Sequence, residues 1–295
     1  MIRALVEAIR PAQWTKNLLV FAGVLFSQQL DRSDLALRAV TGFLAFSLLA
    51  GATYLVNDLK DLEYDRLHPR KQQRAIASGR LPVSMAWAAL VPLLAVVALL
   101  ALGLGRDFVL VAGTYLTLNL AYTFALKEQV LVDVFVISIG FVLRAIAGVE
   151  LLRPVAPDTE LSPWLLVCTF FGALFLALAK RRRELANAGQ QASRQRAVLR
   201  HYGPELLDGL LHISAAASLM SYALYTIWPG TVAKFGSEVM LYTVPFVAYG
   251  IFRYLYLVRV AENTDDPSHV LLTDRPLAAC VGLYLACVLA ILYWT

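Results

Sequence analysis

Residues 57–71 of this chain read Asn57-Asp58-Leu59-Lys60-Asp61-Leu62-Glu63-Tyr64-Asp65-Arg66-Leu67-His68-Pro69-Arg70-Lys71. The stretch places four acidic and four basic side chains directly after an apolar segment. On an α-helix, which advances about 100° per residue, Asn57, Asp58, Asp61 and Asp65 fall within an arc of about 100°. The pattern therefore predicts a helix face on which carboxylates gather.

Gathered carboxylates repel one another unless a cation joins them. Oxygen ligands without His or Cys suit a hard ion such as Mg²⁺, which commonly binds together with substrate phosphates. We therefore expect a Mg²⁺ site for a diphosphate, with Asn57, Asp58, Asp61 and Asp65 as candidate ligands. On a straight helix Asp58 and Asp65 lie about 10 Å apart, so one ion is not expected to join both. The alternative is a solvated, charged helix end.

The composition indicates a membrane protein. Of the 295 residues 59% are hydrophobic and 16% charged, and the mean hydropathy is +0.64, which is too apolar for a soluble domain of this size. We expect an all-α bundle of about nine transmembrane helices that forms one domain over residues 1–295. Polar residues dilute the first span, and Asn119 interrupts the fourth. The expected spans are 12–29, 36–56, 83–104, 107–126, 129–150, 163–180, 207–228, 238–258 and 276–294.

The placement of charge predicts the orientation. With the N-terminus in the cytoplasm, the inner segments carry 20 of the 26 Lys and Arg residues. The acidic run and the long loop after the sixth span then face the cytoplasm. Residues 1–9 carry no cleavable signal and are typical of an interfacial helix. We expect a multi-pass protein of the inner (plasma) membrane, with no nucleic-acid partner.

Covalent catalysis is disfavoured by the remaining reactive side chains. The four histidines have no metal-ligand spacing, and the three cysteines all lie within expected spans, where they are typical of small core residues. The chain also has no nucleophile motif built on Ser or Cys.

Basic residues follow the acidic run. We expect phosphate contacts from Arg66, Lys71 and Arg74. Lys and Arg neutralise the negative charge of a diphosphate that the bound metal ion does not neutralise. For Arg70 and Arg80 the choice between phosphate contact and a positive-inside signal stays open.

A second polar cluster is expected at the inner ends of the fourth and fifth spans, where Tyr122, Lys127 and Asp133 lie. Asp133 is placed one turn into an apolar helix, where a carboxylate needs a partner or a function. A structural salt bridge with Lys127 is the alternative. Arg144, farther along the same segment, is expected to extend outward or to pair with Glu150.

Two further basic segments are candidates for phosphate contact. Lys180 and Arg181 begin a run of four cations that ends at Glu184, and the segment after it, up to residue 206, contains no aspartate. Contact with anionic lipid headgroups, or a topology anchor, explains this run equally well. Near the N-terminus, Lys16 and Asn17 stand at the start of a span, which favours an ionic partner inside the protein.

The pattern Asn57-Asp58-x-x-Asp61-x-x-x-Asp65-Arg66, at the inner end of the second expected span, resembles the first aspartate motif of the UbiA superfamily of intramembrane prenyltransferases. Members of that superfamily hold a Mg²⁺-bound diphosphate between two aspartate-rich motifs, one after span two and one after span six. This chain departs from the pattern at the second motif, where it has Lys180-Arg181-x-x-Glu184.

That departure points to one branch of the superfamily. Together with Arg10-Pro-x-Gln-Trp-x-Lys16-Asn17, Asp65-Arg66-x-His68-Pro69-x-Lys71 and the segment from Lys127 to Asp133, it is similar to the decaprenyl-phosphate phosphoribosyltransferases. The resemblance implies transfer of 5-phosphoribose from phosphoribosyl diphosphate to a polyprenyl monophosphate, with release of diphosphate, for lipid-linked arabinose and cell-wall polysaccharide. The charge pattern agrees, because two phosphate-rich substrates need cations more than further carboxylates.

In this scheme acidic residues hold Mg²⁺ on the diphosphate while positive charge develops at ribose C1. The candidate catalytic residues are Asp58, Asp61, Asp65 and Asp133. The candidate substrate-binding residues are Lys16, Asn17, Arg66, Lys71, Arg74, Tyr122, Lys127, Lys180, Arg181 and Glu184. Asp65 is expected to take a second ion, or to orient Arg66 or a ribose hydroxyl.

Other functions stay open at this point. One alternative is a Mg²⁺-dependent prenyltransferase acting on an aromatic acceptor, and another is a transporter of a phosphorylated solute. Against transport, the charged residues cluster on the inner side and leave few polar groups for a path through the membrane. The expected partners are phosphoribosyl diphosphate, a polyprenyl phosphate lipid and the bilayer, and association with further copies of the chain stays open.

Overall fold

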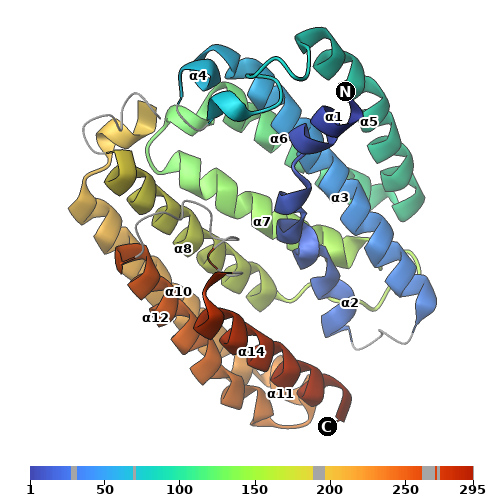
Figure 1. The fold of residues 1–295 in the computed structure, drawn as a ribbon. Coiled ribbons are helices and arrows are strands. Elements are labelled where there is room, and N and C mark those ends of the chain that lie inside the picture. Colours follow the sequence, from blue (N-terminus) through green and yellow to red (C-terminus); the bar gives the residue numbers. More distant parts are fainter. Residues whose placement is uncertain (28–31, 69–70, 189–196, 261–269, 271–272, 295) are drawn as a thin grey trace. The chain divides into compact units, whose positions relative to one another are not determined.

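The computed structural model describes residues 1–27, 32–68, 71–188, 197–260, 270 and 273–294, and all regular elements within them are helical. This confirms the predicted all-α class. The chain divides into two compact units, Met1–Leu161 and Ser162–Thr295 (Figure 1).

The first unit contains four long helices and several short helical segments. The long helices are α3 (Ser33–Lys60), α5 (Val83–Leu104), α6 (Arg106–Phe124) and α7 (Val132–Glu150). The short α-helices are α1 (Ile2–Ala8), α2 (Ala22–Phe26) and α4 (Leu62–Leu67), and the 3₁₀ segments are η1 (Pro11–Phe21), η2 (Lys71–Gln73) and η3 (Leu126–Glu128).

The second unit begins at a helix that the sequence marks clearly, because Pro163 supplies a residue suited to the first helical position. Its elements are α8 (Pro163–Ala188), η5 (Ala197–His201), α10 (Pro204–Ile227), α11 (Pro229–Phe235), η6 (Glu238–Thr243), α12 (Val244–Val260) and α14 (Arg275–Trp294).

Seven helical stretches in the described part of the chain are long and apolar enough to cross a membrane. They are Ser33–Lys60, Val83–Leu104, Val132–Glu150, Pro163–Asn187, Pro204–Ile227, Glu238–Arg259 and Arg275–Leu292. The other two predicted spans, 12–29 and 107–126, are not among them. The structure gives the first as η1 followed by α2, with residues 28–29 outside the described part, and the second as α6. The count of nine stays a prediction.

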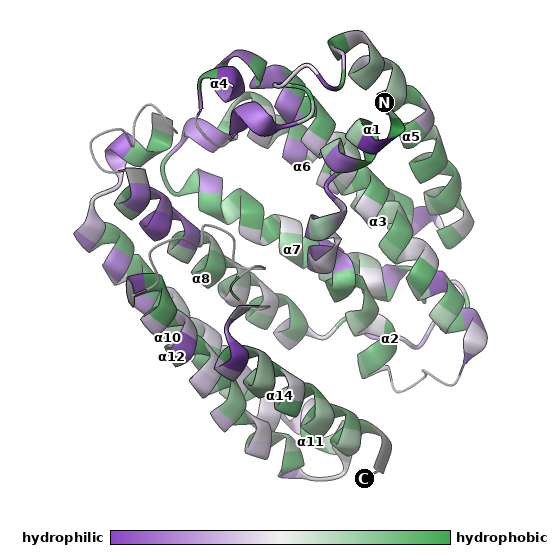
Figure 2. Ribbon diagram, viewed as in Figure 1, coloured by the Kyte–Doolittle hydropathy of each residue, from purple (hydrophilic) through white to green (hydrophobic). Residues whose placement is uncertain are grey.

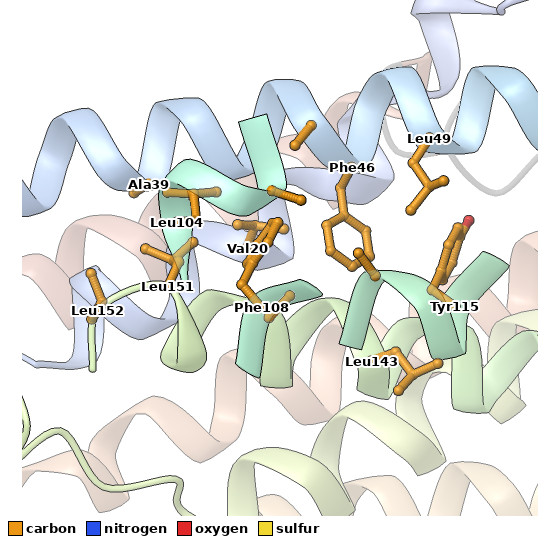
Figure 3. Packing of buried hydrophobic residues seen from close by; sticks show 14 of the residues in the cluster. Val20, Ala39, Phe46, Leu49, Leu104, Phe108, Tyr115, Leu143, Leu151 and Leu152 are labelled. Atoms are coloured by element: carbon orange, nitrogen blue, oxygen red, sulfur yellow. The ribbon is translucent and has the colours of Figure 1, made fainter. Parts of the chain in front are cut away.

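The core of the first unit is formed by apolar side chains of η1, α3, α5, α6 and α7 (Figure 3). Phe46 of α3 lies at its centre, with its ring centroid 5.7 Å from that of Phe108 and 5.2 Å from that of Tyr115. Hydrophobic residues dominate α5 and α7, whereas hydrophilic residues gather at α4 and the segments beside it (Figure 2). The polar end of this unit is therefore where α3 passes into α4.

Two glycines allow the N-terminal segment to approach α7 closely. A Cβ on Gly148 of α7 would lie 2.3 Å from the carbonyl oxygen of Val20, and one on Gly23 would lie 1.9 Å from the carbonyl oxygen of Gly148. Both distances are far below van der Waals contact with backbone that cannot rotate away. Close backbone packing through small residues is typical of helices in membranes.

We expect Gly148→Ala to lower the free energy of unfolding by about 2 kcal/mol, because the added methyl group forces the N-terminal segment away from α7. Thermal unfolding of the purified protein in detergent measures this as a lower midpoint. Gly113→Ala in α6 is the control, since a Cβ there meets nothing within 4 Å, and we expect an unchanged or slightly higher midpoint. Equal midpoints for the two variants would contradict the role of Gly148.

Candidate active site

Two carboxylates of the acidic run converge on one nitrogen atom. Asp58, in the last turn of α3, is 3% exposed, and Asp65, in α4, is 2% exposed. Nη1 of Arg74 lies 3.0 Å from Oδ1 of Asp58 and 2.6 Å from Oδ2 of Asp65. The two carboxylates thus share a single cationic partner at the polar end of the first unit.

We expected that one ion would not join Asp58 and Asp65, whereas in the structure one cationic nitrogen contacts both. The expectation assumed one straight helix, but α3 ends at Lys60 and α4 begins at Leu62. Asp61 lies between them outside helical geometry, with φ −93° and ψ 10°. The helix is thus interrupted between the two carboxylates, and Nη1 of Arg74 contacts both of them.

Asp61 itself contacts a different element. Its Oδ1 lies 2.5 Å from Nζ of Lys127, which belongs to η3 after α6. The alternative in which Lys127 forms its salt bridge with Asp133 is therefore not what the structure shows. Asp133 is fully buried in the first turn of α7, and Tyr122 is half-buried in the last turn of α6.

Further cations surround Asp65. Nζ of Lys71 lies 4.0 Å from its Oδ1, while Arg66 is exposed on α4. Burial raises the pKa of Asp65 above its ordinary value, and the Arg74 and Lys71 charges oppose that shift. Arg70 lies outside the described residues, and Arg80 forms an exposed pair with Glu7 of α1.

Arg10 is a further member of this cluster, although it is not among the residues predicted to bind substrate. Its Nη2 lies 2.5 Å from Oδ1 of Asp58, and its guanidinium carbon lies 4.7 Å from the centre of the Tyr54 ring. In the segment that carries Arg10, the predicted substrate contacts are Lys16 and Asn17. The available signal was the position of Arg10 in the same short motif as those two residues.

The structure corrects the predicted environment of Arg144. Its side chain is 5% exposed and neither extends outward nor pairs with Glu150, whose carboxylate contacts Arg153 at 3.0 Å. Its Nε donates to Oδ1 of Asn17 (2.7 Å), its Nη2 to the hydroxyl of Tyr115 (2.7 Å), and its Nη1 to the carbonyl oxygen of Gly140 (2.8 Å).

Asn17 is correspondingly buried, and its Nδ2 donates to Oγ of Ser47 at 3.1 Å. Lys16, the preceding residue in η1, is half-buried. Asn17 thus joins η1 to α3 and α7 through side-chain hydrogen bonds. The predicted substrate contacts of Lys16 and Asn17 stay predictions.

In the second unit, the basic run at the end of α8 is largely engaged inside that unit. Arg181 is buried and its Nη1 lies 2.6 Å from Oε2 of Glu184. Arg182 pairs with Asp208 at 2.8 Å, and Nη2 of Arg183 donates to the carbonyl oxygen of Leu257 at 2.6 Å. Lys180 is half-buried. The predicted phosphate contacts stay predictions, and the alternatives of a lipid contact or a topology anchor stay open.

The residues at the end of α3 fit a hard divalent cation. Within the described ranges, no three His, Cys, Asp or Glu groups already form a metal cage. However, the carboxylates of Asp58 and Asp65 converge on a point that a positive nitrogen occupies, and the donor set consists of oxygen atoms only. Carboxylate oxygens aimed at one cationic position are the ligands that Mg²⁺ accepts.

Comparison with known proteins identifies relatives over the full length of the chain. The chain is 33% identical over 305 residues to the decaprenyl-phosphate phosphoribosyltransferase of Mycolicibacterium smegmatis, covering all of this chain and 94% of the relative. It is 34% identical over 303 residues to the protein of the same name from Corynebacterium glutamicum, covering 98% of this chain and 86% of that relative.

Among solved structures, the fold is similar to a UbiA homolog from Archaeoglobus fulgidus bound to GPP and Mg²⁺, with a TM-score of 0.71 at 18% identity over 98% of this chain and 99% of that chain. The sequence profile of the UbiA prenyltransferase family matches residues 17–273. With most of its length matched, this chain belongs to the UbiA prenyltransferase family.

Proposed function

We propose that this protein transfers 5-phosphoribose from phosphoribosyl diphosphate to a polyprenyl monophosphate and releases diphosphate. The observation that carries the proposal is the excess of cations at the acidic run. Three aspartates there contact four basic side chains, from Arg10, Lys71, Arg74 and Lys127. This pair of substrates brings a diphosphate, a 5-phosphate and a lipid phosphate, and such a load needs that many positive charges. The two relatives named as phosphoribosyltransferases support the same choice.

Asp58, Asp61 and Asp65, with the side-chain oxygen of Asn57, are the residues proposed to hold Mg²⁺. When bound, the ion stabilises negative charge on the departing diphosphate. Asp133 completes the proposed set of acidic groups. The cytoplasmic orientation of this end, in the plasma membrane, belongs to the same proposal and rests on the distribution of Lys and Arg.

The proposed reaction needs positioning more than proton transfer. The bond from ribose C1 to the diphosphate breaks and its electron pair leaves with the diphosphate, while an oxygen of the lipid phosphate forms the new bond to C1. The lipid phosphate is already an anion, because its second pKa is about 6, so no strong base is required. Lys71, Arg74 and Lys127 bind the phosphate groups and hold the two reactants together.

The remaining predicted contacts form part of this proposal. Lys16 and Asn17 in η1, Arg66 in α4, and Tyr122 at the end of α6 are proposed to bind or orient the substrates. Lys180 and Arg181 are proposed to bind a further phosphate, and Glu184, which pairs with Arg181, is proposed to orient it. Residues 1–295 are proposed to work as one catalytic domain.

The test is product formation from labelled phosphoribosyl diphosphate. Purified protein in detergent is mixed with decaprenyl phosphate and Mg²⁺, and the lipid fraction is extracted and counted. We expect a labelled lipid that requires both the lipid phosphate and Mg²⁺, and that disappears when EDTA is added. A protein that instead labels an aromatic acceptor from a prenyl diphosphate would replace this proposal with prenyl transfer. Solute flux into proteoliposomes that persists in Asp61→Asn would favour transport.

A further inference from the structure

We infer that Arg10 couples metal binding to phosphate binding: it competes with a divalent cation for Asp58 and, when displaced, binds the phosphate groups that accompany the cation. The inference deepens the proposed function and rests on it for the presence of a phosphate substrate. It concerns a residue that stands outside the acidic run and belongs to the N-terminal segment.

The competition follows from the contacts of one oxygen atom. Oδ1 of Asp58 lies 2.5 Å from Nη2 of Arg10 and 3.0 Å from Nη1 of Arg74. A carboxylate oxygen that accepts from two guanidinium groups has its charge balanced already, and a further cation is repelled by both of them. A divalent ion alone therefore binds Asp58 at the expense of an existing, well-formed ion pair.

Arg10 has a second interaction, with an aromatic ring, that remains when its guanidinium leaves the carboxylate. Its guanidinium lies over the ring of Tyr54, which stands four residues before Asp58 and thus on the same face of α3. A cation over an aromatic face is stabilised without a carboxylate. Movement away from Asp58 therefore leaves Arg10 beside the metal position and not in bulk solvent.

The backbone of Arg10 adopts a left-handed conformation that positions its side chain near Asp58. Arg10 has φ 54° and ψ 66°, and in the described part of the chain Leu131 is the only other non-glycine residue with a positive φ. Such a conformation is strained for a residue with a Cβ and persists only where the surroundings enforce it. Here it turns the chain between α1 and η1, the point from which Arg10 reaches the end of α3.

Accessibility and chemistry favour phosphate as the second partner. The Arg10 side chain is 26% exposed, whereas that of Asp58 is 4% exposed, so Arg10 faces an entering ligand first. The planar guanidinium forms paired hydrogen bonds with phosphate oxygens. When metal and diphosphate arrive together, each arginine exchanges a carboxylate for a phosphate and loses no charge partner. Metal alone offers no such exchange.

The test compares two affinities in the full-length protein in detergent, measured by calorimetry. One ligand is Mn²⁺ alone, and the other is magnesium diphosphate mixed beforehand. For Arg10→Gln we expect Mn²⁺ to bind about tenfold more tightly and magnesium diphosphate about tenfold more weakly. Arg3→Gln makes the same change of charge at an exposed position of α1, and both affinities should stay unchanged.

A second variant separates the two interactions of Arg10, its ion pair with Asp58 and its contact with the ring of Tyr54. Tyr54→Leu leaves the Asp58 pair in place but removes the ring, so it should weaken magnesium diphosphate and leave Mn²⁺ affinity unchanged. If Arg10→Gln lowers both affinities together, Arg10 merely supports the fold, and the inference fails. It also fails if neither affinity changes.

These outcomes are independent of the transfer assay. Opposite shifts in the two affinities, with no labelled lipid product, would overturn the proposed substrates and leave the role of Arg10 intact. Product formation without the opposite shifts would overturn the role of Arg10 alone.

Discussion

Asp58→Asn is expected to lower kcat/KM for phosphoribosyl transfer by about 10²–10³-fold, the loss typical of removing one preorganised electrostatic group. The substitution keeps the size and planarity of the side chain and removes only its negative charge. The carboxylate of Asp58 contacts both Arg10 and Arg74, and Arg74 also contacts Asp65. Without the negative charge of Asp58, the two guanidiniums repel a divalent cation that the site is proposed to bind.

Initial rates over a range of Mg²⁺ concentrations measure this effect, and the Mg²⁺ concentration for half-maximal rate should also rise. Asp34→Asn is the matched control. It makes the same change on the same helix, but in the first turn of α3, where Asp34 is exposed and pairs with Arg32. We expect Asp34→Asn to stay within about twofold of the parent rate, as is usual for exposed ion pairs. If Asp58→Asn is equally active, Asp58 is not part of the catalytic machinery.

The acidic run could be located from sequence because its signal is local. Carboxylate spacing and an adjacent apolar span are enough to identify it, and the structure does bring Asp58, Asp61 and Asp65 to one end of the first unit. Its geometry could not be predicted in the same way. No proline or glycine marks the break at Asp61, and the residue that contacts Asp61 there, Lys127, lies 66 positions away.

The N-terminal segment shows the opposite case, in which the composition correctly indicated an irregular span. Polar residues within 12–29 dilute its hydropathy, and this stretch is indeed not one continuous α-helix. The reason emerges only from tertiary contacts: Gly23 lies against Gly148, and Asn17 reaches Arg144, 127 residues away. Such pairings leave no periodic pattern in the sequence, so the 3₁₀ geometry of η1 could not be predicted from it.

The Arg144 network is the second place where a single substitution should have a large effect. Arg144 is a buried cation whose acceptors, from Asn17, Tyr115 and Gly140, are all uncharged. Rings of Tyr115 and Phe141 lie 4.8 Å and 5.1 Å from its guanidinium carbon. A buried charge of this kind is tolerated only while its hydrogen bonds are complete.

We therefore expect Asn17→Leu to lower the free energy of unfolding by about 3 kcal/mol, because Nε of Arg144 loses its acceptor and remains charged. Ser138→Ala is the control. Ser138 of α7 is also buried and donates its hydroxyl to the carbonyl oxygen of Val134 at 2.8 Å, but this bond involves no charged group, and we expect a loss below about 1 kcal/mol. Thermal midpoints in detergent measure both.

The double variant Asn17→Leu with Arg144→Met decides between two explanations of that loss. If the cost comes from an unsatisfied buried charge, removing the charge as well should restore much of the stability, since apolar replacements of buried ionic groups are often near neutral. If the cost comes instead from lost packing of η1 against α3 and α7, the double variant should be no more stable than Asn17→Leu, because Arg144→Met would remove further contacts. A double-mutant cycle gives the coupling directly, and a coupling near zero would show that Asn17 and Arg144 act independently despite the 2.7 Å between them.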